Sequence, residues 1–306
     1  MLEQNRPGHS VLTYLTSISG SKVVSGIHNR EPNSLPDKQT AEVTKRTSIV
    51  PGLWSGDFLF SAADVSHRAT MIREARRQWE LGSIVNIMCH VAPPTQPDVC
   101  AWEGGIISKL TDGQWADLIK PGGRLNKAWL ARLDDQAVHL TYLKQHGVQV
   151  LYRPFHEMNQ GQFWWAGRRG TAGTAALYRL THDYMTKVHK LTNLIWVWDM
   201  QDMSRDFADY NPGDKYWDIF AFDVYDRGFD KSWYDYILPI VGDKPMAIGE
   251  CDKLPTAKML DEQPRWCFFM SWAELTFEKN SDASIRDLYR SPRLVHQRDL
   301  PDFRKR

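Results

Sequence analysis

The chain has 306 residues, of which 42% are hydrophobic and 25% are charged, and its formal net charge is +1. This length fits one large α/β barrel or two ordinary domains, and the composition is that of a soluble globular protein. The near-neutral charge gives no reason to expect nucleic acid or an anionic membrane surface as a partner.

The sequence contains no candidate membrane span, because no apolar stretch approaches the roughly 18 residues that crossing a bilayer requires. The N-terminal segment MLEQNRPGHSVLTYL lacks the charged start and apolar core of a signal peptide. We expect a secreted protein whose signal peptide is absent from this sequence, with a cytoplasmic protein as the alternative.

The four cysteines, Cys89, Cys100, Cys251 and Cys267, lie far apart and form no C-x-x-C pair. This spacing argues against a zinc site and against a small disulfide scaffold. One disulfide and four free thiols both remain open.

Short apolar segments recur along the chain, and each one ends in polar residues. Continuous apolar runs of this kind suit strands that are buried on both faces of a parallel sheet. We count eight of them, at 22–28, 48–57, 83–90, 148–157, 194–200, 219–226, 245–252 and 266–274.

Helical patterns lie between several of these strands. One runs from Asp64, a candidate N-cap, to Gly82, and a second runs from Asn126 to Gly147. Further helices are predicted from Thr174, over KSWYDYILPIV and over TAKMLDEQ. Eight strands alternating with helices predict a single-domain (β/α)8 TIM barrel over residues 1–306. The long interval 91–126 is expected to overhang the same end of the barrel as the loop after strand 4.

The active site of such a barrel lies at the carboxyl ends of its strands, which turns a set of strand-end residues into a spatial cluster. Each residue alone has about even odds of a structural role, but together they place two glutamates on opposite walls. The strand-end residues are His28, Trp54, Asp57, His90, Arg153, His156, Glu157, Asp223, Tyr225, Glu250, Trp272 and Glu274.

Two carboxylates that face each other across an aromatic cleft suggest cleavage of a glycosidic bond, with one acting as acid/base and the other as nucleophile. Sugar rings explain the aromatic residues, because a pyranose has an apolar face that packs on an indole. Trp196 and Trp198, inside a strand, are better explained as core. Trp164 and Trp165, together with Phe163, follow a strand end, and we expect them on a loop surface that contacts substrate.

The segments RPFHEMNQGQFWW, FDVYD and IGE resemble the signature segments of glycoside hydrolase family 26. This family consists mostly of β-mannanases, which are retaining (β/α)8 barrels with catalytic glutamates after strands 4 and 7. The resemblance covers nearly the whole chain, since His90 and the segment SWAE also fall where the family pattern has them.

The resemblance implies that Glu157 is the acid/base and Glu250 the nucleophile. His156 would tune the acid or bind sugar, while Arg153 and Tyr225 would orient the nucleophile. The remaining substrate contacts would come from His90, Phe163, Trp164, Trp165, Trp272 and Trp54. Physical chemistry agrees, because an apolar setting raises the pKa of an acid and a nearby cation such as Arg153 favours an ionised nucleophile.

One departure from the family pattern bears on the substrate. Gln162 stands where the family usually has a tryptophan, and Ala166 precedes Gly167. The loss of an aromatic residue five positions after Glu157 weakens the inference to mannan, and xylan or mixed-linkage β-glucan remain alternatives.

We therefore predict a retaining endo-β-1,4-mannanase that acts as a monomer on a β-linked polysaccharide or oligosaccharide, without a cofactor or metal. A non-catalytic barrel that binds polysaccharide is the alternative from another functional class. A zinc peptidase is disfavoured, because HEMNQ has Gln160 where the motif H-E-x-x-H requires a second histidine.

Overall fold

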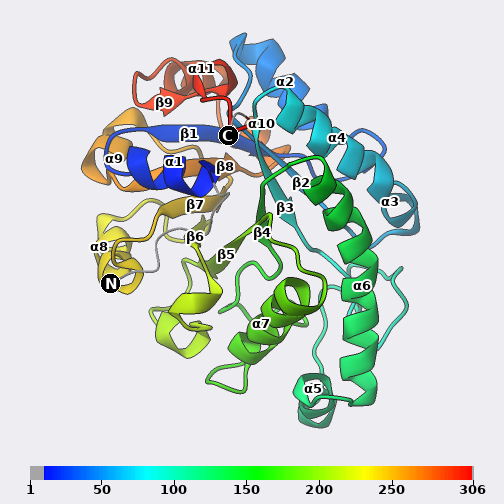
Figure 1. The fold of residues 1–306 in the computed structure, drawn as a ribbon. Coiled ribbons are helices and arrows are strands. Elements are labelled where there is room, and N and C mark those ends of the chain that lie inside the picture. Colours follow the sequence, from blue (N-terminus) through cyan, green and yellow to red (C-terminus); the bar gives the residue numbers. More distant parts are fainter. Residues whose placement is uncertain (1–9, 305–306) are drawn as a thin grey trace.

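The computed structural model describes residues 10–304, so most of the N-terminal segment considered above as a leader lies outside the described residues. Eight parallel strands form a sheet in the order β2-β3-β4-β5-β6-β7-β8-β1, and the pairing of β1 with β2 closes it into a barrel (Figure 1). The strands are β1 Val23–His28, β2 Leu53–Asp57, β3 Ile84–Met88, β4 Val150–Arg153, β5 Leu194–Gln201, β6 Ile219–Val224, β7 Met246–Cys251 and β8 Trp266–Ser271. All eight predicted strands and the predicted (β/α)8 fold are confirmed.

Helices surround the strands, as Figure 1 shows, and α6 is the longest of them. The helices are α1 Ser10–Ile18, α2 Lys38–Thr47, α3 Ala62–Ser66, α4 Arg68–Glu80, α5 Asp112–Ile119, α6 Arg124–Gln145, α7 Thr174–Asp183, α8 Lys231–Val241, α9 Ala257–Glu262, α10 Leu275–Glu278 and α11 Asp282–Tyr289. Shorter elements are the π-helical turn η1 Tyr184–Val188, the 3₁₀ turns η2 Phe207–Tyr210, η3 Asp214–Tyr216 and η4 Gln297–Asp299, and the strand β9 Leu294–Val295, which pairs with β1. No helix between residues 10 and 304 combines the length and apolar character that crossing a membrane requires.

The predicted helix from Asp64 to Gly82 is two helices, α3 and α4, and its start was placed wrongly. Ser61 caps α3, because its hydroxyl accepts a hydrogen bond from the backbone N–H of Asp64, which is already helical. Serine and aspartate are both good N-caps, so the two positions compete, and the earlier one wins. The predicted end is confirmed, since α4 stops just before Gly82, whose φ of +98° suits glycine.

The eight barrel strands are buried along their whole length, which explains their continuous apolar patterns. Side chains alternate between the barrel interior and the helices. In β2, Ser55 bonds His28 and Asn86 inside the barrel, whereas the indole of Trp54 donates to Pro36 O, just before α2. The site residues found below therefore come from the inward-facing positions and from the loops that follow the strands.

The long interval 91–126 lies against the loop after β4, as predicted. Ile107 forms a β-bridge with Phe163, and the backbone N–H of Trp164 donates to Ile106 O at 3.2 Å. The interval also contains α5, whose N-cap Thr111 forms a capping box with Gln114. All four cysteines are free, which resolves the alternative left open by their spacing.

Candidate active site

Glu157 lies in the loop after β4, and its backbone has a left-handed conformation with φ of +48°. This conformation is uncommon for a residue with a side chain, so the surroundings must hold it. The backbone N–H of Glu157 donates to Asp199 Oδ1 at 2.8 Å, and Gln160 Nε2 donates to Glu157 Oε2 at 2.8 Å. The carboxyl group of Glu157 is thereby fixed at the carboxyl end of the barrel, where it is only 5% exposed.

Glu250 lies near the end of β7, and both of its carboxylate oxygens have a donor. Arg153 Nη2 lies 2.5 Å from Oε1, and the Tyr225 hydroxyl lies 2.7 Å from Oε2. A Cβ atom at the preceding Gly249 would lie 2.5 Å from Asp223 Oδ1 and 2.8 Å from Arg153 Nη1. The glycine of the IGE segment is therefore needed for the close approach of charged groups to the β7 backbone.

The two glutamates converge. One carboxylate oxygen from each of Glu157, Asp223 and Glu250 lies within 4.8 Å of the other two. The catalytic carboxyl groups of retaining glycosidases stand about 5–5.5 Å apart, and those of inverting enzymes stand about 6.5–9.5 Å apart to admit a water molecule. The observed spacing fits the retaining arrangement. Converging carboxylates could also attract a cation, but the guanidinium of Arg153 already supplies positive charge here.

The electrostatic settings of the two glutamates differ. Burial, and then the charge of Glu250, raise the pKa of Glu157 well above its usual value. Burial also raises the pKa of Glu250, to about 7, but the charge of Arg153 and the hydrogen bond from Tyr225 work against that rise. Arg153 and Tyr225 therefore favour the ionised form of Glu250, whereas burial and the charge of Glu250 favour the protonated form of Glu157, which is the division of roles that a nucleophile and an acid require.

Arg153 is the centre of the buried charge network. Its Nη1 lies 2.6 Å from Asp199 Oδ2 and 3.0 Å from Asp223 Oδ1, while its Nη2 serves Glu250. Burial alone would lower the pKa of Arg153, but these carboxylates outweigh it and raise that pKa. For Asp223, burial and then the charges of Asp199 and Glu250 raise the pKa well above its usual range, so one guanidinium serves several carboxyl groups that cannot all ionise.

Three histidines lie at the same end of the barrel, and His156 directly precedes Glu157. His90 Nδ1 lies 2.5 Å from Asp57 Oδ2, and the ring of His90 lies 4.3 Å from that of His156. His28 stacks on Trp272 at 4.4 Å. Burial, followed by the charges of His90 and Arg153, lowers the pKa of His156 well below its usual value, so this imidazole is neutral at neutral pH. Its buried Nδ1 has no hydrogen-bond partner within residues 10–304.

Three of the predicted aromatic contacts need correction. Trp164 and Trp165 are 1% and 0% exposed, so the expectation of a loop surface is wrong for both. Trp164 packs edge-on against Trp129 and donates to Val91 O, and this places it in the core between the barrel and α6. Trp54 points outward to the α2 side and is equally buried. Trp54 is the second residue of β2 and so lies away from the carboxyl end of that strand.

Trp165 lies beneath the site and supports it. Its indole donates to His156 O at 3.0 Å, and its ring stacks on Phe163 at 4.6 Å. Phe163 in turn contacts the rings of His90 and His156. Together with Arg153, His156, Glu157, Tyr225, Glu250 and Trp272, these residues form one connected group at the carboxyl ends of the strands.

Two residues of this region were missed from the sequence. Asp199 interrupts the apolar strand LIWVWDM, and a lone carboxylate in a buried strand was the signal that could have found it. Trp102 belongs to the long interval after β3; it is 41% exposed and its ring lies about 6 Å from the rings of His90 and Phe163. No strand pattern marks Trp102, because its place follows from the path of the loop.

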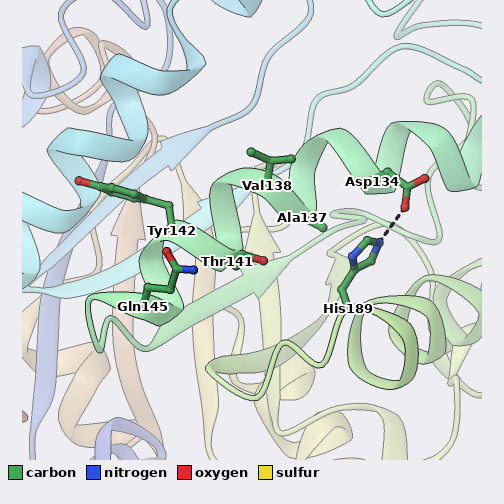
Figure 2. Close-up of a pocket in the computed structure, with 7 residues that line it drawn as sticks. All are labelled: Asp134, Ala137, Val138, Thr141, Tyr142, Gln145 and His189. Carbon is green, nitrogen blue, oxygen red and sulfur yellow. Dashed lines mark hydrogen bonds and ion pairs between the residues drawn. The ribbon is translucent and has the colours of Figure 1, made fainter.

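A hollow of about 490 Å³ elsewhere on the surface contains none of the site residues described above. Figure 2 shows that its lining comes from the outer side of α6 and from His189, which lies 2.8 Å from Asp134. The C-terminal half of α6 leads to the amino end of β4, so this hollow extends away from the strand ends that carry Glu157 and Glu250.

The sequence of this chain matches the family model described as glycosyl hydrolase family 26 over residues 3–299. The chain belongs to glycosyl hydrolase family 26. A family 26 structure, GH26A from a Muricauda species, is 30% identical with a TM-score of 0.92, and the match covers 98% of this chain and 99% of that one. A Podospora anserina GH26-CBM35 β-(1,4)-mannanase structure is 27% identical with a TM-score of 0.81, covering 99% of this chain and 69% of that one.

A curated relative, a mannan endo-1,4-beta-mannosidase from Thermothelomyces thermophilus, is 32% identical over 294 residues, which cover 91% of this chain and 58% of the relative. This family 26 chain therefore spans somewhat more than half the length of that relative. The family resemblance expected from RPFHEMNQGQFWW, FDVYD and IGE is confirmed.

Proposed function

We propose that this chain is a retaining endo-β-1,4-mannanase in which Glu157 is the acid/base and Glu250 is the nucleophile. The observation that carries the proposal is the pair of buried carboxyl groups with oxygens within 4.8 Å, one bonded to a guanidinium and the other not. Names of family relatives supply the substrate, since several are mannan endo-1,4-beta-mannosidases.

The proposed reaction has two displacements. Glu250 attacks the anomeric carbon while Glu157 protonates the departing glycosidic oxygen, and a covalent glycosyl-enzyme forms. Glu157, now ionised, then takes a proton from water, which attacks the same carbon and releases Glu250. Each displacement inverts the anomeric carbon, so the product keeps the β configuration.

The supporting residues divide by what they contact. Arg153 and Tyr225 hold the Glu250 carboxylate through 2.5 and 2.7 Å hydrogen bonds. The ring of Trp272, which is partly exposed, is available to a sugar beside the glutamates, whereas the Nδ1 of His156 is buried. Phe163 and Trp102 would extend the apolar surface, in place of Trp164 and Trp54, which face away.

A second substrate class remains a candidate because Gln162 replaces the aromatic residue usual in the family. The backbone N–H of Gln162 donates to Gln160 Oε1, so this residue belongs to the loop whose Gln160 also bonds Glu157. A polar residue here removes an apolar platform for a sugar ring, and xylan and mixed-linkage β-glucan are the alternative substrates. We also propose that the protein acts outside the cell, because a polymeric substrate cannot cross a membrane. We propose that it acts there as a monomer.

The test is release of reducing ends from galactomannan, glucomannan, xylan and mixed-linkage glucan at pH 5 to 8. We expect the fastest release from the mannans, and Glu250→Ala should lose at least about 10³-fold of the rate while the protein remains folded. Binding in affinity gels without any release would overturn the proposal in favour of a non-catalytic barrel. Faster release from xylan or mixed-linkage glucan would keep the mechanism and correct the substrate.

A further inference from the structure

Asp199, near the carboxyl end of β5, is fully buried and connects the two glutamates. Its Oδ1 accepts the backbone N–H of Glu157 at 2.8 Å, and its Oδ2 accepts Arg153 Nη1 at 2.6 Å. The other terminal nitrogen of Arg153 lies 2.5 Å from Glu250 Oε1. A single carboxylate therefore joins the backbone of one glutamate to the side chain of the other.

The backbone of the Glu157 loop depends on the same residue twice. Besides the contact from Glu157, the backbone N–H of Met158 donates to the Asp199 carbonyl at 3.3 Å. Glu157 has a φ of +48°, a left-handed conformation that is unfavourable for an L-residue unless its surroundings hold it. Two consecutive amides bonded to one residue of a rigid strand provide that support.

We propose that Asp199 is a positioning residue that sets the separation of Glu157 and Glu250, by holding the Glu157 backbone with one oxygen and Arg153 with the other. The proposal rests on the proposed function, since it concerns the reaction assigned to these glutamates. Asp199 touches neither the substrate nor the reacting atoms, so it acts only through these two neighbours.

Asparagine at this position separates a positioning role from simple packing. The Asp199→Asn side chain has nearly the same shape, but it offers one acceptor atom and one donor group. Whichever way the amide turns, either the Glu157 N–H or Arg153 Nη1 faces another donor. The two contacts cannot both survive, and the glutamates should lose their mutual placement.

A matched control comes from the opposite end of the barrel. Asp218 Oδ2 accepts the backbone N–H of Trp196 at 2.8 Å, just before β6, and contacts neither glutamate. Asp218→Asn removes the charge of a carboxylate that holds a strand backbone but keeps one acceptor for its single contact, so it reports the effect of losing a carboxylate away from the glutamates.

The experiment compares kcat/KM on mannan and on an activated aryl β-mannoside for the wild type, Asp199→Asn and Asp218→Asn, with thermal midpoints for all three. Displacement of a catalytic group by about 1 Å can cost about 100-fold, and we expect Asp199→Asn to lose at least that on mannan. The loss on the aryl substrate should be at least about tenfold smaller, because an activated leaving group needs little protonation by Glu157. Asp218→Asn should change both rates by the same small factor.

Asp199→Asn should also shift both limbs of the pH–rate profile to lower pH, since the charge of Asp199 raises the pKa values of Glu157 and Glu250. Equal losses on the two substrates with unmoved limbs would overturn the inference. If Asp199→Asn does not fold, Asp199→Ser is measured in the same way, and failure of both to fold would make Asp199 a folding residue and also overturn it. A wild type that is inactive on every β-glycan would instead overturn the proposed function before any variant is compared.

Discussion

Removal of the guanidinium between the carboxylates tests the electrostatic part of the mechanism. Arg153 is 1% exposed and bonds Glu250, Asp199 and Asp223, so Arg153→Met leaves several buried carboxyl groups without a cation. Removing one partner of a buried ion pair costs about 3–5 kcal/mol, and one pKa unit corresponds to about 1.4 kcal/mol. If about 3 kcal/mol of the lost ion-pair free energy falls on the ionised form of Glu250, the pKa of Glu250 rises by about two units.

We expect the acidic limb of the profile of kcat/KM against pH to move to higher pH. Glu250 has a pKa of about 7 in the wild type and must be ionised to attack, so kcat/KM should rise with pH through that region. In Arg153→Met the midpoint of this rise should move up by about two units, and the rate at pH 6 should fall about 100-fold. The assay is kcat/KM on a soluble mannan from pH 4.5 to 9.5.

Arg68→Met is the matched control for this experiment. Arg68 is also buried and pairs with Asp98 at 2.5 Å, but it contacts neither glutamate. It should lower the thermal midpoint without moving the acidic limb. If Arg153→Met also leaves the limb in place, the charge of Arg153 does not control Glu250, and the assignment of the nucleophile loses its physical basis.

Two further predictions concern stability. Trp164→Ala should lower the free energy of unfolding by about 3–5 kcal/mol, because a buried indole covers about 150–250 Å² of surface. Trp102 is 41% exposed, so Trp102→Ala should lower the free energy of unfolding by under about 1 kcal/mol and mainly weaken oligosaccharide binding. Denaturant unfolding and binding titrations would check the pair, and similar unfolding free energies would mean that Trp164 is not core. Burial raises the pKa of Glu157 on folding, so the folded state retains a proton that the unfolded state loses above about pH 4.5, and stability falls as pH rises. Glu157→Gln should make the thermal midpoint decline less steeply between pH 5 and 8. Glu278→Gln, at an exposed position, should leave the decline as it is in the wild type. Identical slopes for Glu157→Gln and the wild type would contradict the assignment of Glu157 as the protonated partner.

The barrel could be predicted from the sequence because its signal is local. Each strand is a short apolar run with a polar end, and burial on both faces makes the run continuous, so all eight were found. The helix start at Ser61 was missed because Ser61 and Asp64 are both good caps, and only the folded chain decides between them.

The positions of Glu157 and Glu250 also followed from the sequence, since the carboxyl ends of barrel strands must meet at one end. Which way an aromatic ring points did not follow. Trp164 and Trp165 follow a strand end, as substrate contacts do, but the packing of the interval 91–126 buries them. Trp54 is the second residue of β2, and side-chain alternation turns it outward. Asp199 was missed for the opposite reason, because its strand reads as core and its function depends on contacts with residues more than 40 positions away.

The central claim, a double displacement by Glu157 and Glu250, is tested most directly by the anomeric configuration of the first product. Proton NMR in the first minutes of mannan hydrolysis observes the new reducing end before mutarotation mixes the anomers. Carboxyl oxygens within 4.8 Å fit the short separation of retaining enzymes, so the β anomer should form first. An initial α anomer would contradict the covalent intermediate and the role of Glu250 as nucleophile.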